Sequence, residues 1–142
     1  MDTAFVERLR RAAEQIFRDQ PILAAYAFGS RLRGRPRPAS DLDVGYYVTG
    51  YRRGEALSLR REMLLASALS DTLGVDIDLR SLAEAPLELK GRVLEEGVRI
   101  YSGDDAARVG LERDLLARYH DYKDAFHRMH EIRLRELARS GR

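Results

Sequence analysis

The sequence predicts an α/β or α+β domain built around a small mixed β-sheet that is flanked by helices. Three observations support this. Apolar residues recur at helical spacing over three long segments, at 3–18, 54–73 and 104–139. Between them lie short apolar or alternating segments that have the character of strands, at 22–28, 42–48, 75–80 and 98–101. The length of 142 residues suits one domain over 1–142.

The first half of the chain reads as a helix followed by two strands. Phe5, Leu9 and Ala13 fall on one side of the first helix, and Gln20-Pro21 ends it. The next segment, 22–28, is apolar without a helical period and runs into Gly29, as a buried strand does. Glycines, prolines and arginines then predict a loop up to Ser40. In 42–48 apolar residues alternate with others, which predicts a strand with two different faces.

The second half alternates helices with strands. We expect a helix over 54–73 that ends at Gly74, with a core stripe made of Leu57, Met63, Leu64, Ala68 and Leu69. In 75–80, Val75, Ile77 and Leu79 share one strand face, and Asp76, Asp78 and Arg80 share the other. A short helix follows Pro86 and ends near Gly97, 98–101 forms a last edge strand, and 104–139 is one long helix.

Composition excludes several classes of protein. There is no cysteine, so a disulfide framework, a thiolate metal site and a cysteine nucleophile are excluded. No run approaches the roughly 20 apolar residues of a membrane span, and the N-terminal residues lack the pattern of a secretory signal. A net charge of +2 gives no indication of direct nucleic-acid binding. We therefore expect a soluble cytoplasmic protein without membrane partners.

Paired carboxylates form the first candidate site. Asp41 and Asp43 are two residues apart on a predicted strand, so both side chains leave the same face. Two carboxylates held together repel each other unless a cation lies between them, and Mg²⁺ prefers such oxygen ligands. A third acid would complete a two-metal arrangement. Asp76 and Asp78 lie on the polar face of the next strand, and either could supply it.

A phosphate-binding element precedes this pair. Gly29-Ser30 follows a strand, and a glycine there lets the backbone approach a phosphate while the serine hydroxyl adds a hydrogen bond. Arg31 and Arg33 lie next to it in the loop, and we expect one or both to bind the triphosphate or an acidic surface of a partner. Each motif alone is common, as a turn or as a solvated strand face. Their joint occurrence favours a site that holds a nucleoside triphosphate and directs a hydroxyl at its α-phosphorus.

The motifs also resemble those of a known family. Gly29-Ser30-Arg31-Leu32-Arg33-Gly34 followed by Ser40-Asp41-Leu42-Asp43-Val44 resembles the signature of the polymerase-beta-type nucleotidyltransferase superfamily. More narrowly, the chain is similar to the minimal nucleotidyltransferases, the MNT antitoxins of HEPT–MNT toxin–antitoxin pairs. The similarity continues over 77–86, 93–101 and 118–123. The family usually has a small residue where this chain has Leu32, which lies on the loop and is not among the ligands.

The resemblance implies a nucleotidyltransferase fold and a set of site residues. Gly29, Ser30, Arg31 and Arg33 would bind ATP, and Asp41, Asp43 and Asp78 would bind Mg²⁺ and carry catalysis, with Asp76 as a rival for the third position. It implies an enzyme that transfers AMP from ATP to a tyrosine hydroxyl of a cognate HEPT ribonuclease toxin and thereby silences it.

Two alternative functions remain open at this stage. One is a non-catalytic antitoxin that neutralises the toxin by binding. The other is nucleotidyl transfer to a small molecule, against which the lack of room for an acceptor-binding domain argues. The predicted helix 104–139 is longer than a helix that only covers a small sheet needs to be. Its last part is therefore a candidate surface for the toxin or for a second copy of the chain.

Overall fold

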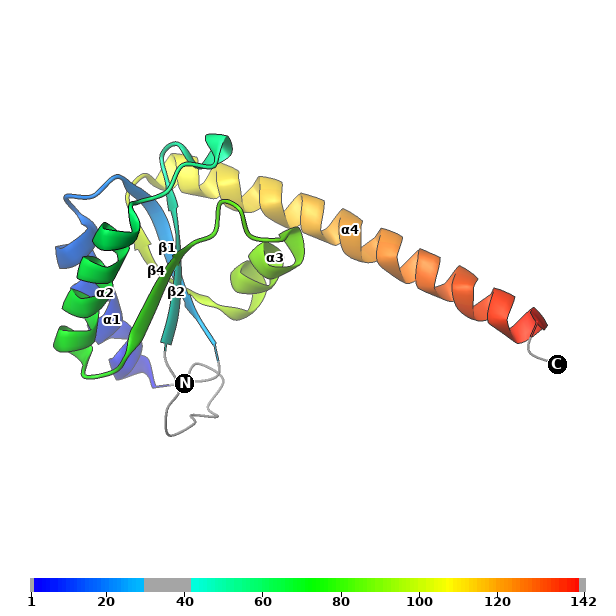
Figure 1. The fold of residues 1–142 in the computed structure, drawn as a ribbon, viewed down its shortest axis with the longest axis horizontal. Helices are drawn as coiled ribbons and strands as arrows, with labels where there is room; N and C mark the ends of the chain where they lie inside the picture. The colour runs from blue at the N-terminus through cyan, green and yellow to red at the C-terminus, as the bar shows by residue number, and fades with distance from the viewer. Residues whose placement is uncertain (1, 30–41, 141–142) are drawn as a thin grey trace.

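The computed structural model describes residues 2–29 and 42–140. Helices and strands follow the predicted order along the chain (Figure 1). Their bounds are α1 (Thr3–Phe17), β1 (Ile22–Phe28), β2 (Leu42–Val48), α2 (Leu59–Leu73), β3 (Ile77–Ser81), α3 (Leu87–Glu96), β4 (Val98–Ser102) and α4 (Asp105–Ser140), with a 3-10 turn η2 (Tyr51–Arg53) after β2. The fold class predicted from the sequence is confirmed.

The four strands form one mixed sheet in the order β3-β2-β1-β4. β1 pairs antiparallel with β2 and with β4, whereas β2 and β3 run parallel. The parallel pair requires a crossover, and α2 supplies it. β4 lies at an edge of the sheet, as 98–101 predicted.

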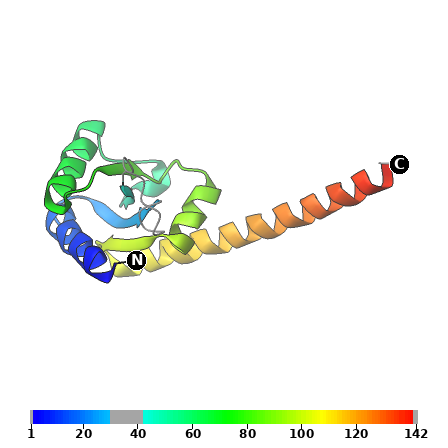
Figure 2. The ribbon, with the colours of Figure 1, turned by 90° about the horizontal axis from the view of Figure 1, so that it is seen from below.

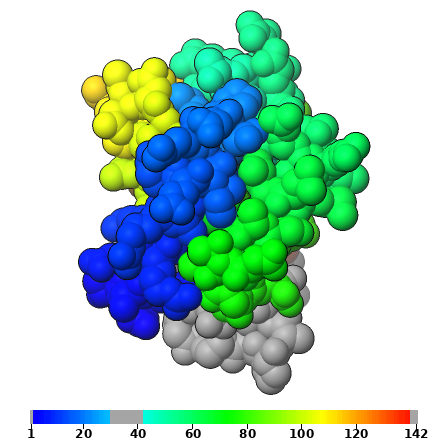
Figure 3. Space-filling model, turned by 90° about the vertical axis from the view of Figure 1, so that its left-hand side faces the viewer, coloured from blue at the N-terminus to red at the C-terminus, as the bar shows by residue number. Residues whose placement is uncertain are grey.

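Helices cover both faces of the sheet. Figure 1 shows α1 and α2 on one side of the sheet, and α3 with the first turns of α4 on the other. Figure 3 views the first side and shows α1 and α2 next to each other over the sheet. Adjacent strand residues therefore enter two different cores: Tyr46 packs beneath α1 and α2, and Tyr47 packs beneath α4. The predicted two faces of 42–48 are both buried.

The helix predicted over 54–73 is shorter, and its core stripe was partly wrong. Gly54 has φ +76° and closes the η2 turn, so the helix begins after Ser58, whose side chain caps it by accepting from the Arg61 amide. The buried stripe consists of Leu65, Leu69 and Leu73. The predicted core residues Met63 and Leu64 are 62% and 61% exposed. Leu57 lies before the helix, so its position does not report which helix face is buried.

The helix α4 has two unlike halves. Leu111, Leu115 and Tyr119 are buried against the sheet and α3. Beyond them the helix continues away from the sheet and its other helices, as Figure 2 shows in a view turned from that of Figure 1. In the part of the chain that the structure describes, no helix is both long and apolar enough to cross a membrane.

Candidate active site

The two sequence motifs meet where β1 ends and β2 begins. Phe28, the last residue of β1, is the register partner of Asp43 on β2. Gly29 follows with φ +112°, a conformation that L side chains rarely adopt. A Cβ built on Gly29 would lie 2.9 Å from the Asp43 Oδ2 atom. Glycine is therefore required at position 29 for two reasons: its positive φ angle and the close approach of the Asp43 carboxylate.

Asp43 also faces a second carboxylate across the sheet. Asp43 on β2 and Asp78 on β3 are register partners in the parallel pair. Paired residues on adjacent strands lie about 5 Å apart and project from the same face. Both side chains are only partly exposed. Two carboxylates in this arrangement repel each other, so a cation near both is favoured.

The guanidinium of Arg80 is one such cation. The Arg80 Nε and Nη2 atoms each lie 2.7 Å from the Asp78 Oδ2 atom. The hydrogen bond to Asp78 and the charges of Asp78 and Asp43 raise the pKa of the Arg80 guanidinium. Sequence reasoning placed Arg80 on the face of Asp78 but gave it no role. The alternation of residues in 75–80 was the signal that could have found it.

Asp76, the rival for the third carboxylate, lies just before β3 and is exposed. Its backbone carbonyl accepts a hydrogen bond of 2.9 Å from the Leu42 amide. The strand face shared by Asp76 and Asp78 was predicted, but Asp78 is the residue whose register partner is Asp43.

Four of the predicted site residues, Ser30, Arg31, Arg33 and Asp41, lie outside the described residues. Within 2–29 and 42–140 there is no group of three or more carboxylate or imidazole side chains that could hold a metal ion. Of the predicted metal ligands, Asp43 and Asp78 lie in the described part of the chain, and they are register partners. Oxygen atoms of carboxylates are the ligands that Mg²⁺ takes, usually one or two of them with substrate phosphates, so the pair fits this ion.

A cavity of about 200 Å³ adjoins Gly29 on the side of α3. Phe28, Gly29, Leu89, Arg92, Val93 and Glu96 line it. The Arg92 Nε atom donates to Glu96 over 3.2 Å. Because Arg92 and Gly29 line the same cavity, a guanidinium lies near the start of the predicted phosphate-binding motif. Nothing in the sequence pointed to Arg92, because its helical segment carries no pattern that distinguishes it from a solvated face.

Facing carboxylates on neighbouring strands beside a glycine turn are suited to holding a phosphate with its cation. The comparisons with known proteins point to the same chemistry. The family model described as "Polymerase beta, Nucleotidyltransferase" matches residues 12–106, which include Gly29, Asp43 and Asp78. No curated protein matches the sequence significantly.

Solved structures with a similar fold come from toxin–antitoxin complexes. A chain from the complex of a tri-AMPylated Shewanella oneidensis HEPN toxin with an MNT antitoxin is 18% identical, with a TM-score of 0.62 over 91% of this chain and 98% of that one. A toxin–antitoxin structure with AMP-PNP is 16% identical, with a TM-score of 0.60 over 94% and 98%. A chain from the MntA–HepT toxin–antitoxin structure is 14% identical, with a TM-score of 0.57 over 96% of this chain and 99% of that one.

The chain belongs to the polymerase beta nucleotidyltransferase family. The solved structures share its fold over nearly the whole of both chains. The predicted family is therefore confirmed, and the chain is a nucleotidyltransferase.

Proposed function

We propose that this nucleotidyltransferase is an antitoxin that uses Mg²⁺ and ATP to transfer AMP to a tyrosine hydroxyl of a cognate HEPN (HEPT) ribonuclease toxin. The observation that carries the chemical part is the pairing of Asp43 with Asp78 beside Gly29. The similarity in fold to antitoxins, one of them bound to a tri-AMPylated toxin, supports the choice of acceptor.

Each residue has a defined task in this proposal. Gly29 and Ser30 donate backbone and hydroxyl hydrogen bonds to the triphosphate, and Arg31 and Arg33 balance its charge. Asp41, Asp43 and Asp78 hold Mg²⁺, which neutralises phosphate charge when bound. The tyrosine oxygen forms a bond to the α-phosphorus, the bond from that phosphorus to the bridging oxygen breaks, and pyrophosphate leaves. A carboxylate accepts the tyrosine proton.

We assign the proton-accepting role to Asp78 rather than Asp76. Asp78 faces Asp43 in register, whereas Asp76 precedes the strand. Arg80 is a positioning residue in this scheme, since its guanidinium holds the Asp78 carboxylate in place over 2.7 Å. Because Arg80 is exposed, it can leave Asp78 when another cation approaches.

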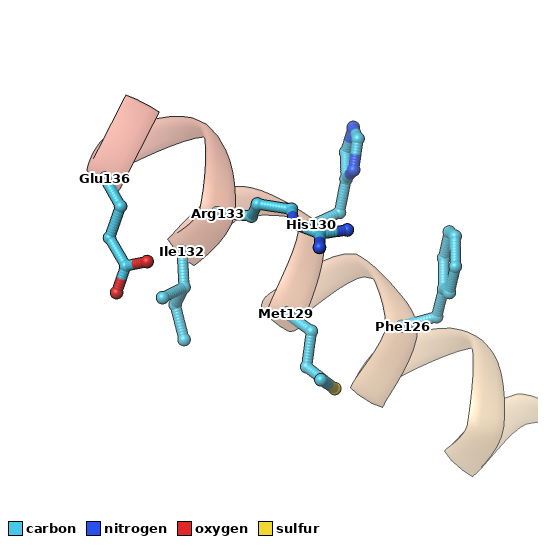
Figure 4. Close-up of a pocket in the computed structure, with 6 residues that line it drawn as sticks. All are labelled: Phe126, Met129, His130, Ile132, Arg133 and Glu136. Carbon is cyan, nitrogen blue, oxygen red and sulfur yellow. The ribbon is translucent and has the colours of Figure 1, made fainter. Parts of the chain in front are cut away.

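The projecting half of α4 is the proposed surface for the toxin. Phe126, Met129, His130, Ile132, Arg133 and Glu136 line a hollow along this helix. Figure 4 shows that all six side chains come from α4 alone. A hollow with a single wall becomes an enclosed, water-free contact only when a second surface packs on it. A helical partner would complete such a surface.

The test of catalysis is labelling of the cognate toxin by ATP and Mg²⁺, followed by mass spectrometry of its tyrosines. We expect Asp43→Asn and Asp78→Asn each to lower the rate by more than about 100-fold, since each removes a group that acts on the reacting atoms. Asp19→Asn, an exposed acid after α1, is the matched control and should label normally. Labelling by Asp43→Asn at the normal rate would refute the role of the pair.

A second candidate is neutralisation by binding alone, which the exposed apolar side chains of α4 favour. The double variant Phe126→Ser with Met129→Ser should weaken toxin binding by about 10–100-fold, because it removes two central apolar side chains. Titration calorimetry with catalytically inactive Asp43→Asn protein isolates this effect. If toxin activity remains inhibited in the presence of Asp43→Asn protein, binding alone suffices and AMP transfer is dispensable.

A further inference from the structure

A second cavity lies on the same side of the sheet as Asp43, at the other end of β2. It has a volume of about 280 Å³. Its lining comes from β2, η2, α3, α4 and the segment that joins β3 to α3, and includes Tyr47, Tyr51, Arg52, Lys90, Asp114 and Arg118. This volume is slightly below the roughly 300–1,000 Å³ typical of sites for drug-sized ligands. The cavity therefore suits a compact ligand.

Three cations converge on this cavity. Arg52, Lys90 and Arg118 line it, and the acid in the lining is Asp114, which lies 3.6 Å from Arg118. The lining thus has an excess of two positive charges. Burial, and then the charge of Arg118, lower the pKa of the Lys90 ammonium below its ordinary value. Like charges gathered in a partly desolvated place are unfavourable until an anion joins them.

The tyrosine at the inner side of the cavity has an unused hydroxyl. Tyr47 is 1% exposed, and its Oη atom is buried without a hydrogen-bond partner in the described part of the chain. A buried hydroxyl that forms no hydrogen bond costs about 1–3 kcal/mol, so proteins seldom keep one. Its ring lies edge-on to Tyr51, 5.5 Å between centroids, and Tyr51 also lines the cavity.

This cavity is separate from the candidate active site. Tyr47 lies four residues after Asp43 on the same strand, which corresponds to about 13 Å. Gly45 lies between them, and a Cβ on Gly45 would meet the Leu82 side chain at 2.6 Å. Leu82 therefore covers the strand between the two places. The cavity does not contain Asp43, Asp78 or Gly29.

We propose that this cavity is a second site, which binds a small phosphate-bearing anion through Arg52, Lys90 and Arg118, and that the Tyr47 ring shifts on binding so that its buried hydroxyl donates the innermost hydrogen bond. A phosphate group carries about −1.5 to −2 charges at pH 7, which matches the excess charge of the lining. The guanidinium groups supply forked donors that fit phosphate oxygens. The proposal does not depend on the acceptor or on the antitoxin role.

The experiment is a titration of the whole ¹⁵N-labelled chain with inorganic phosphate at constant ionic strength, followed by amide chemical shifts. We expect saturable shifts at Arg52 and over 111–118, with little change at Asp43 or Asp78. The same should hold for the Asp43→Asn variant, so a failure of the proposed catalysis would leave this result intact. Pyrophosphate and AMP, titrated in the same way, establish which phosphate compounds the cavity accepts.

Variants sharpen the test. Tyr47→Phe should weaken phosphate binding about 10- to 100-fold, since one hydrogen bond to a charged group is lost. Lys90→Gln combined with Arg118→Gln should weaken it by at least about 10-fold. Arg113→Gln, on α4 but outside the cavity lining, is the matched control and should bind as the parent does.

Three outcomes would overturn the proposal. The first is the absence of saturable shifts even when the phosphate concentration is raised well above about 1 mM, a Kd typical of weak binding. The second is equal shifts with acetate, which would mean that the cavity does not select phosphate. The third is unchanged affinity in the Lys90 and Arg118 double variant, provided that its amide spectrum shows it to be folded.

Discussion

The two halves of α4 carry the same kind of apolar stripe but have opposite surroundings. Leu111, Leu115 and Tyr119 in the first half are buried. At the same helical spacing, Tyr122, Phe126 and Met129 in the second half are 41%, 56% and 71% exposed. The apolar spacing continues beyond Tyr119, but after the contacts of His120 and Lys123 with Glu95 of α3 the helix extends away from the sheet (Figure 2).

Polar contacts differ between the halves in the same way. In the first half, Arg108 donates to Glu112 over 2.6 Å, Glu112 accepts from the Tyr26 hydroxyl over 2.8 Å, and Arg108 also donates to Ser102 over 3.0 Å. Arg108 is buried. This network fixes the start of α4 to β1 and β4. The comparison teaches that the first half belongs to the folded core, whereas the second half keeps its apolar side chains exposed.

The largest expected difference between the halves is in the loss of stability when an apolar side chain is truncated to alanine. Leu111→Ala should lower the free energy of unfolding by about 2–5 kcal/mol, because it leaves a cavity under a fully buried side chain. Met129→Ala should change it by less than about 0.5 kcal/mol, because the side chain is exposed in the free protein. Urea denaturation followed by circular dichroism measures both. A loss of more than 1.5 kcal/mol in Met129→Ala (about half a typical core truncation) would show that the second half already has a partner.

The buried ion pair should give the next largest effect. Glu112→Ala leaves the Arg108 guanidinium without its closest carboxylate and should cost about 2–3 kcal/mol. Glu131→Ala, in the exposed second half, should cost no more than about 0.5 kcal/mol. Both are measured by urea denaturation as above. Equal costs for the two variants would contradict the division of α4.

Alanine substitutions at two glycines should change the stability less, and in opposite directions from each other. Gly29→Ala should destabilise the protein by about 1–3 kcal/mol, since φ is +112° and the new methyl group would meet Asp43. Gly110→Ala on α4 should stabilise it by about 0.5–1 kcal/mol, since a Cβ there meets nothing within 4 Å and alanine favours the helix. The two melting temperatures should move in opposite directions. A lower melting temperature in Gly110→Ala would mean that this face of α4 is covered.

The smallest effect concerns pH. The hydrogen bond from the Ser102 hydroxyl, over 2.6 Å, and the nearby arginines lower the pKa of Asp105 at the start of α4. A carboxyl group with a lowered folded pKa stabilises the fold above its unfolded pKa of about 3.9, and this stabilisation is lost as pH falls through the folded pKa. Asp105→Asn should therefore flatten the acid limb of a stability–pH curve. Ser102→Ala should flatten it partly, and an unchanged curve in both would contradict the assignment.

The sequence predicted most elements because each periodic pattern reports on one segment at a time. The strands 22–28 and 42–48 and the helix after Pro86 match β1, β2 and α3 closely. The helix 54–73 failed at its start, since Gly54 and Ser58 together create a turn and a cap that a search for apolar periodicity overlooks. Met63 and Leu64 were assigned to the core for the same reason.

For the candidate site, the spacing of Gly29, Asp43 and Asp78 was enough to propose phosphate and metal chemistry. Their roles remain predictions, as do those of Ser30, Arg31, Arg33 and Asp41. Sequence spacing could not rank Asp78 above Asp76, because both occupy the same predicted face. The register of β3 against β2 makes Asp78 the partner of Asp43, and that register depends on how the α2 crossover closes.

Residue identities along the chain thus indicated the helices, the strands and the family, and they predicted phosphate and metal chemistry at the acidic residues, since these depend on local periodicity and on short motifs. The arrangement of strands brought Asp78 and Arg80 beside Asp43, and Tyr47, Lys90 and Arg118 around one cavity. It also left half of α4 beyond the sheet. Such contacts join residues far apart in sequence, so they follow from strand order and packing, which no local pattern contains.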